Sequence, residues 1–246
     1  MGTTLWALVQ DHDEELQELQ ERIGYQFRDL QLLQLSLVHS SYAFERLDDK
    51  RHNETLEFLG DAVLDLTVGY ILFTSFPDLR EGKLTRIRSA LVNEGGLAHM
   101  ARGVELGKYL LLGRGENASK GREKPSILSC AYEALVGALF LDGGYDAALD
   151  FVRRFFEPHI AKRGDHLIIA DAKSSLQEFL QEQFNEGPEY VLKSEEGPAH
   201  ARQFTIAACF QEKELGLGKA SSKKEAEQQA ARVALQQLEQ EKENDL

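Results

Sequence analysis

The sequence predicts a multidomain protein in which an all-α domain is followed by a smaller α+β domain. Over residues 11–160 the apolar side chains recur at spacings of three and four, which is the period of amphipathic helices. Over residues 171–240 the period changes, and helix-like segments enclose stretches that alternate like strands. The length of 246 residues exceeds that of one average domain. We expect residues 161–170, which break the helical period, to be the linker.

The helical segments of the first domain end at Gly, Asp or Pro. The segment 54–76 is apolar on most sides, so we expect it to form a buried central helix that ends before Pro77. The last segment is expected to stop at Gly143 and Gly144, and a Gly-rich, charged loop over residues 113–126 precedes it. The expected helical segments are residues 14–24, 30–43, 54–76, 79–103 and 127–144.

The second domain reads as helix, three strands and helix, which is an α-β-β-β-α sandwich with one sheet covered by two helices. Helices are expected over residues 171–184 and 221–240, and only the final EKENDL resembles a frayed tail. The expected strands are residues 189–197, 201–211 and 214–220.

Composition and charge describe a soluble chain, since 42% of the residues are hydrophobic and 28% are charged. The net charge of −13 argues against a protein that holds nucleic acid by bulk positive charge. Two cysteines cannot form a disulfide framework, which fits a reducing compartment. The opening MGTTLWALVQ lacks the basic start of a signal peptide, and no apolar stretch reaches the ~20 residues of a membrane span. We expect a cytoplasmic protein with no membrane partner.

Acidic residues recur at spacings of three and four inside the most apolar helix. Glu54, Glu57 and Asp61 lie within roughly 60° of one another on a helix face, and Asp65 continues the series. The alternative, a solvated face of a core helix, is weakened because the residues between these acids are apolar. Gly60 costs about 1 kcal/mol of helix stability relative to Ala, which suggests the close approach of another helix.

A further acid, Glu133, lies in the apolar helix ILSCAYEALVGALFL, where a lone charge is either paired or bound to a metal. Oxygen ligands select hard cations such as Mg²⁺ or Mn²⁺, which suit phosphate substrates. A zinc pattern is absent from the sequence, because Cys130 and Cys209 stand far apart with no histidine set nearby. These residues favour metal-assisted chemistry on a phosphodiester, with a buried ion pair at Glu133 as the alternative.

Four runs of residues in the first domain resemble those of a known family. The run NETLEFLGDAVL resembles the signature of the ribonuclease III family, and HSSYAFE, LREGKLTRIRSALV and YEALVGALFLDGGY agree with that family in order and spacing. The C-terminal part resembles a double-stranded-RNA-binding domain. Together the two resemblances cover nearly the whole chain, in the arrangement of the simple bacterial enzyme.

The resemblance implies an endoribonuclease for double-stranded RNA that works as a homodimer in the processing of ribosomal and messenger RNA precursors, leaving 5′-phosphates and 3′ overhangs. Asp61 and Glu133 would be catalytic and, with Glu57, would line a Mg²⁺ site in which Mn²⁺ can substitute. Glu54 and Glu81 match further acidic positions of the same valley, used in the family for metal, substrate or subunit contacts.

One residue departs from the family pattern. The position three before Glu133 is normally an Asp metal ligand, and here it is Cys130. A neutral thiol supplies neither the charge nor the hard oxygen that Mg²⁺ prefers. Either catalysis is weakened, or a water molecule takes the place of the missing Asp ligand at position 130. We expect weaker Mg²⁺ binding and reduced cleavage, with retained RNA binding. The alternatives are a catalytically impaired double-stranded-RNA-binding protein and, much less strongly indicated, a helical metal-storage protein.

The last expected helix of the second domain has Lys223 and Lys224 in its first turn. A flexible segment with Lys219 precedes it. The amide groups of a helix N-terminus already favour phosphate. The resemblance implies that these lysines, with Ser222, clamp phosphates across the major groove. It also implies two groups of minor-groove contacts of the kind that A-form RNA requires. These groups are the loop Gly197, Pro198, Ala199 and His200, and the helix residues Ser174, Gln177 and Glu178.

Overall fold

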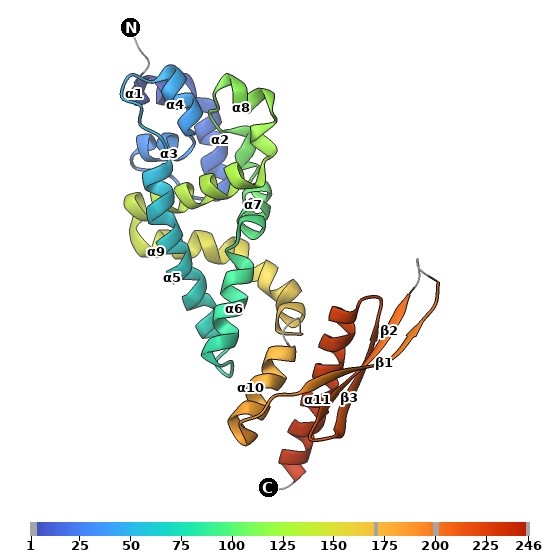
Figure 1. Cartoon of the computed structure of the whole chain (residues 1–246). Helices are drawn as coiled ribbons and strands as arrows, with labels where there is room; N and C mark the ends of the chain where they lie inside the picture. Colours follow the sequence, from blue (N-terminus) through green and yellow to red (C-terminus); the bar gives the residue numbers. More distant parts are fainter. Residues whose placement is uncertain (1–3, 170–171, 199–201, 245–246) are drawn as a thin grey trace. The chain divides into compact units, whose positions relative to one another are not determined.

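The computed structural model describes the backbone of residues 4–169, 172–198 and 202–244, and it divides the chain into two compact units, Met1–Lys162 and Arg163–Leu246. The first unit is all helical and the second combines helices with a sheet (Figure 1). The predicted fold class is confirmed. The division falls inside residues 161–170, but the backbone there is helical up to Ile169 rather than irregular, because the preceding helix continues through it.

The first unit contains more and shorter helices than the sequence predicts. A first helix, α1, lies before the expected start of the domain, and Thr4 caps it by accepting a hydrogen bond from the Ala7 amide. The α-helices are α1 (Leu5–Asp11), α2 (Asp13–Ile23), α3 (Leu30–Ser36), α4 (Ser40–Arg46), α5 (Glu54–Ser75), α6 (Glu81–Leu91), α7 (Glu94–Gly103), α8 (Arg114–Ala118) and α9 (Pro125–Ile169). Two short 3₁₀ turns accompany them, η1 (Leu106–Lys108) and η2 (Gly121–Glu123).

Two expected helices are each divided, for local reasons. The segment 30–43 breaks into α3 and α4 because Val38 forms a parallel bridge with Leu111, and the side chain of His39 then caps α4. The segment 79–103 breaks into α6 and α7 because the Asn93 side chain accepts from the Gly96 amide, which starts a new helix. The loop 113–126 is partly helical, since it holds α8 and η2.

Helix α9 turns sharply where the sequence predicts a stop. Gly144 has φ 78° and ψ −168°, a conformation that glycine adopts without a steric penalty, and helical geometry resumes after it. Asp142 lies just before this turn. Its carboxylate accepts hydrogen bonds from the Tyr25 hydroxyl and from the amides of Arg28 and Asp29, and so fastens the segment before α3 to α9.

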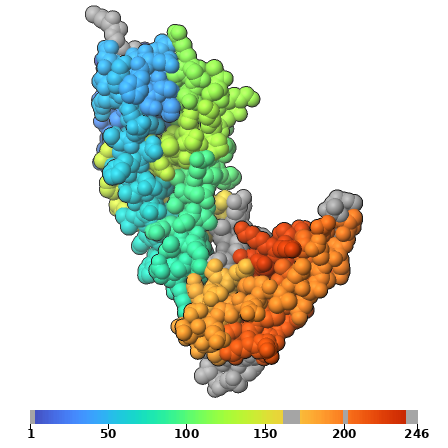
Figure 2. All heavy atoms as spheres, in the orientation of Figure 1, coloured from blue at the N-terminus to red at the C-terminus, as the bar shows by residue number. Residues whose placement is uncertain are grey.

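Helix α5 ends at Ser75, before Pro77 as predicted, but it is not buried all round. One side packs in the core through Leu56, Val63, Leu64, Val68, Ile71 and Leu72. The other side lies open on the surface of the unit, where the blue-green helix is visible in Figure 2. Four large apolar side chains on α5 are 45–82% exposed in the single chain: Phe58, Leu66, Tyr70 and Phe73.

The second unit has the predicted α-β-β-β-α order. Helix α10 (Ala172–Phe184) precedes strands β1 (Glu189–Glu196), β2 (Gln203–Phe210) and β3 (Lys213–Ala220), and α11 (Lys223–Asn244) follows. The strands form an antiparallel sheet in the order β1-β2-β3. Both helices pack on the sheet through a core of Leu176, Leu180, Ala208, Phe210, Leu215, Ala230 and Ala234. The backbone of α11 stays helical to Asn244, so the first four residues of the expected tail belong to the helix.

One helix within the described residues, Pro125–Ile160, is long and apolar enough to cross a membrane. In the structure 61% of its apolar window is buried inside the first unit, and Gly144 interrupts it. These are the properties of a core helix of a globular domain, so this segment gives no support for a membrane partner.

Candidate active site and RNA-binding surface

The candidate site begins with the contact between α5 and α9. A Cβ atom at Gly60 would overlap the carbonyl oxygen of Glu133, and one at Gly137 would overlap the carbonyl oxygen of Leu56. The two backbones therefore touch at reciprocal glycines, which fits the close approach that Gly60 suggested. Because Gly137 lies one turn after Glu133, and Leu56 lies next to Glu57, this crossing brings the two glutamates face to face.

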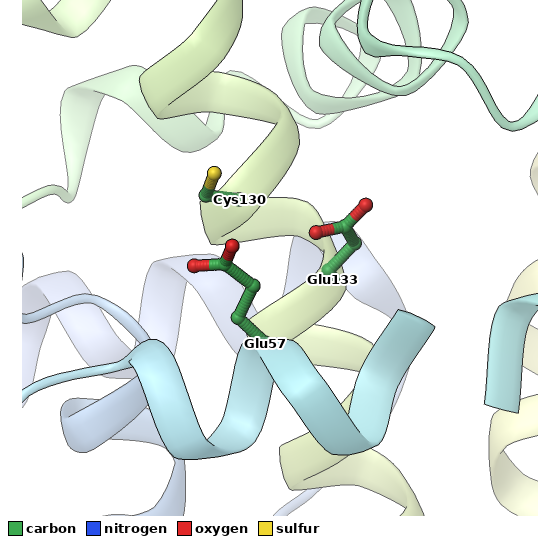
Figure 3. Close-up of side chains that lie close together, drawn as sticks. All are labelled: Glu57, Cys130 and Glu133. Carbon is green, nitrogen blue, oxygen red and sulfur yellow. The ribbon is translucent and has the colours of Figure 1, made fainter. Parts of the chain in front are cut away.

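A cluster of three possible metal ligands forms beside the crossing. One ligand atom from each of Glu57, Cys130 and Glu133 lies within 4.8 Å of the other two, and all three residues are half-buried. Figure 3 shows Glu57 reaching from α5 toward Cys130 and Glu133, which project from successive turns of α9. We call these three residues the α5–α9 cluster. The geometry joins residues more than 70 positions apart in the sequence.

The cluster is electrostatically strained. Burial, together with the charges of Glu57 and Asp61, raises the pKa of Glu133 to about 7. Burial, a hydrogen bond with Glu57 and the charges of both glutamates raise the pKa of the Cys130 thiol to about 12. At neutral pH and without a cation, Cys130 is therefore a neutral thiol and Glu133 is partly protonated.

The remaining predicted acids lie at different distances from this cluster. Asp61 is exposed one turn along α5 and is close enough to Glu133 to raise its pKa. Glu54 is exposed in the first turn of α5, with a carboxylate oxygen 3.8 Å from Nδ1 of His52. Glu81 starts α6, accepts a hydrogen bond from Thr85, and lines a hollow with residues of the far end of α5. A single chain thus does not bring Glu81 into the α5–α9 cluster.

The donor set fits a divalent cation only in part. Two carboxylates at short range are good ligands for a hard divalent cation, and their mutual repulsion is what a positive ion would relieve. The sulfur of Cys130 does not match the oxygen preference of Mg²⁺. The cluster therefore offers two donors of the class that a hard divalent ion prefers and one donor of a different chemical class.

A basic surface lies at the start of α11 in the second unit. Lys223 and Lys224 occupy the first turn, as predicted, and Ser222 caps the helix by accepting from the Glu225 amide. The ammonium of Lys223 lies 5.5 Å from the ring centre of Phe204. Lys219 is on β3, and its ammonium contacts Glu196 at 3.4 Å. Three lysines and a serine thus gather where the sheet meets the helix.

The other predicted RNA contacts are only partly described. Ser174, Gln177 and Glu178 share one face of α10, with Gln177 and Glu178 exposed. Gly197 has φ 91° in the turn after β1, a conformation that favours glycine, and Pro198 follows it. His200 and Ala199, predicted to enter the minor groove, lie outside the described residues.

Comparison with known proteins settles the family. The model described as Ribonuclease-III-like matches residues 29–160, and the Double-stranded RNA binding motif matches residues 172–238. Ribonuclease 3 of Desulfotalea psychrophila is 56% identical over 239 residues, covering 97% of this chain and 99% of that protein. This chain belongs to the ribonuclease III family.

Further relatives agree with this assignment. Ribonuclease 3 of Oleidesulfovibrio alaskensis is 46% identical over 91% of this chain and 97% of that protein. The crystal structure of the nuclease domain of ribonuclease III from Campylobacter jejuni matches with a TM-score of 0.54 at 42% identity, over 58% of this chain and 94% of that chain. The chain is thus a ribonuclease III type endoribonuclease for double-stranded RNA, in a family that depends on a divalent metal.

Two features of this ribonuclease III escaped the sequence reasoning. Gly137 is the partner of Gly60 in the helix crossing, and its signal was a glycine inside an otherwise apolar helix, one turn after Glu133. The exposed apolar face of α5 was expected to be buried. Its residues Phe58, Leu66, Tyr70 and Phe73 lie eight, four and three positions apart, which is a helical stripe that a second protein surface could cover as well as the core of the same chain.

Proposed function

We propose that this ribonuclease III cleaves duplex RNA at the α5–α9 cluster and Asp61, using Mg²⁺, with Mn²⁺ as a substitute. The observation that carries this proposal is the convergence of Glu57 and Glu133, whose ligand atoms lie within 4.8 Å of each other. Burial and the charge of Glu57 raise the pKa of Glu133 there, and a bound cation would stabilise its charged form. A divalent cation held there supplies Lewis acidity toward a phosphodiester and a water nucleophile. Glu57 and Glu133 would hold the cation. Asp61, which is exposed on α5 one turn after Glu57, would face the RNA.

The products of this reaction would carry 5′-phosphates, because attack by water on phosphorus leaves the 3′ oxygen as the departing group. Short 3′ overhangs would result if the two strands are cut at staggered positions. Processing of ribosomal and messenger RNA precursors in the cytoplasm is the setting that we propose. The RNA-binding unit would hold the duplex through the lysines at the start of α11 and the exposed face of α10.

Cys130 would weaken the Mg²⁺ site. A carboxylate at this position would add one negative charge and one hard oxygen, and the neutral thiol adds neither. The chain would therefore need more Mg²⁺ for half-maximal cleavage than its Cys130→Asp variant, while both bind duplex RNA equally.

Homodimer formation is the quaternary structure that we propose, through the open face of α5. Phe58, Leu66, Tyr70 and Phe73 leave a larger apolar area in water than isolated surface residues do. A second structure of the nuclease domain from Campylobacter jejuni, with a TM-score of 0.55, is described as showing structural flexibility in a region involved in dimer formation. Light scattering at micromolar concentration should give twice the chain mass, and a monomer mass would contradict the proposal.

The decisive experiment compares cleavage of a long RNA duplex by this chain and by Cys130→Asp across a series of Mg²⁺ concentrations. We expect both to cut, with the Asp variant ahead at limiting Mg²⁺. Equal rates at limiting Mg²⁺ would contradict the role given to Cys130. A gel shift of the duplex with and without Mg²⁺, combined with no cutting by this chain, would select the impaired RNA-binding protein instead.

A further inference from the structure

The metal preference of the α5–α9 cluster follows from its unusual donor set. Sulfur from Cys130 and oxygen from Glu57 and Glu133 converge within 4.8 Å. Thiolate ligands favour thiophilic cations such as Zn²⁺, whereas Mg²⁺ requires oxygen ligands in near-octahedral geometry. Around a tetrahedral ion with ordinary Zn–S and Zn–O bond lengths, neighbouring donors lie about 3.6 Å apart. The upper limit of 4.8 Å on the separations of the three ligand atoms leaves little movement to reach that value.

The scaffold limits how the three donors can move. Cys130 and Glu133 are three residues apart on α9, so they share one helix face. Glu57 comes from α5, whose distance from α9 is set by direct backbone contact at Gly60 and Gly137. Two rigid helices therefore present one sulfur and two carboxylates to the same point. Three protein ligands leave a fourth tetrahedral position for water or substrate, as in catalytic rather than structural zinc sites.

We propose that the α5–α9 cluster of this enzyme binds a thiophilic divalent cation of the Zn²⁺ class, through Cys130, Glu57 and Glu133, in preference to Mg²⁺. Binding breaks the S–H bond of Cys130, releases its proton to solvent, and leaves the electron pair on sulfur, which bonds the cation. No electron is transferred, so no oxidant or reductant is needed. The inference deepens the proposed function, since it concerns the same cluster, and it makes Zn²⁺ a competitor of Mg²⁺ for that cluster.

The cation Co²⁺ is the probe for this proposal, because it resembles Zn²⁺ in ligand preference and its thiolate complexes absorb in the near ultraviolet. The full-length chain is titrated with Co²⁺ alone, and a thiolate-to-cobalt absorption band is recorded. We expect the band to saturate at about one ion per chain, with about one proton released per ion. The band should survive a roughly 100-fold excess of Mg²⁺ and disappear on addition of Zn²⁺.

Matched variants assign the band to Cys130. Cys209→Ser removes the other cysteine, which lies on β2 of the RNA-binding unit outside the proposed site, and it should keep the band. Cys130→Ser should lose it, and Cys130→Asp should lose it while gaining affinity for Mg²⁺, measured by calorimetry. Glu133→Gln should keep sulfur but bind Co²⁺ about tenfold or more weakly. Circular dichroism checks that each variant is folded.

Several results would overturn the inference. These are the absence of a band in the parent chain, a band that persists in Cys130→Ser, a band that is lost in Cys209→Ser, and displacement of Co²⁺ by equimolar Mg²⁺. The outcome is independent of duplex cleavage. A chain that cuts RNA with Mg²⁺ but shows no band contradicts only this inference, whereas a chain with the band and no cutting under any divalent cation contradicts only the proposed function.

Discussion

Both units of this ribonuclease III contain a close backbone contact at glycines. Acidic side chains lie beside the contact in the first unit, and lysines lie near the contact in the second. In the first unit α5 and α9 touch at Gly60 and Gly137, and the acids beside this contact are half-buried. In the second unit β3 lies against α11 at Gly216 and Gly218, where added Cβ atoms would meet the carbonyl oxygens of Ala230 and Ala226. The lysines predicted to bind RNA, Lys219, Lys223 and Lys224, lie close to this contact in the chain and remain exposed. The contact in the first unit thus brings two glutamates together, whereas the contact in the second unit packs a strand against a helix.

The largest effect should come from filling the α5–α9 contact. In Gly60→Ala the new methyl group meets the Glu133 carbonyl, which is backbone and cannot rotate away, so the helices must separate. We expect a loss of roughly 3 kcal/mol in the free energy of unfolding of the first unit, at the upper end for overpacked cores, and near-complete loss of cleavage. Differential scanning calorimetry and duplex cleavage measure the two effects.

Gly103→Ala is the matched control for that prediction. Gly103 ends α7, and a Cβ there would meet nothing within 4 Å. Alanine should leave stability unchanged or raise it by up to about 1 kcal/mol. If Gly60→Ala were as well tolerated as this control, the close crossing would not be what places the acids.

The lysines at the start of α11 should contribute to affinity for duplex RNA but not to the stability of the second unit. Lys223→Ala with Lys224→Ala removes two positive charges from the first turn of α11, where they oppose the helix dipole. We expect about tenfold or greater loss of duplex affinity, a salt slope smaller by about two, and no loss of stability. Fluorescence anisotropy at several salt concentrations tests this. Arg232→Ala, exposed further along α11, is the control, and an equal loss there would mean that charge alone matters.

Glu133 should contribute less to the stability of the metal-free protein as the pH rises. The pKa of Glu133 is raised from 4.5 to about 7 in the fold, so between these values the folded state holds a proton that the unfolded state has lost. The contribution of Glu133 to stability therefore falls from pH 4.5 to pH 7, by about 1 kcal/mol once solvent screening of this half-buried group is allowed for.

The measurement is the difference in unfolding free energy between this chain and Glu133→Gln, taken at several pH values with a chelator present. The difference cancels the contributions of other titrating groups. A difference that stays constant from pH 4.5 to pH 7 would show that burial and the charges of Glu57 and Asp61 do not raise the pKa of Glu133.

The smallest effect concerns one buried hydroxyl in each unit. Among the described residues the hydroxyls of Tyr132 and Tyr190 are buried and have no hydrogen-bond partner. An unpaired buried hydroxyl costs free energy, so Tyr132→Phe and Tyr190→Phe should each raise stability by up to about 1 kcal/mol. Chemical denaturation measures this, and a stability loss in either variant would indicate a partner such as a buried water molecule.

Helical periodicity and the change to strand alternation were enough to predict both fold classes and the acid-bearing helix. Finer detail depended on contacts that period alone does not encode. The break between α3 and α4 comes from the bridge between Val38 and Leu111, which are distant in sequence. The exposure of Phe58 and Phe73 could not be predicted because an apolar stripe has the same pattern whether its own chain or another covers it.

Prediction of the site followed the same division. The spacing of Glu57 and Asp61 along one helix was readable, and Glu133 stood out as an acid among apolar residues. The structure adds that Cys130 joins Glu57 and Glu133 at ligand distance. Glu81 could not be placed by spacing, because it lies after the turn that reverses the chain at Pro77 and so reaches the opposite end of α5.

The reciprocal glycine contact has a consequence for how this protein tolerates mutation. A contact between two backbones has no side-chain rotamers, so its geometry does not depend on which apolar residues fill the surrounding core. Swaps such as Leu64→Met or Val68→Ile can then accumulate at a cost of about 1–2 kcal/mol each without moving the glutamates apart. In a saturation-mutagenesis scan for cleavage, α5 and α9 should accept many residues at their buried positions and none but glycine at positions 60 and 137.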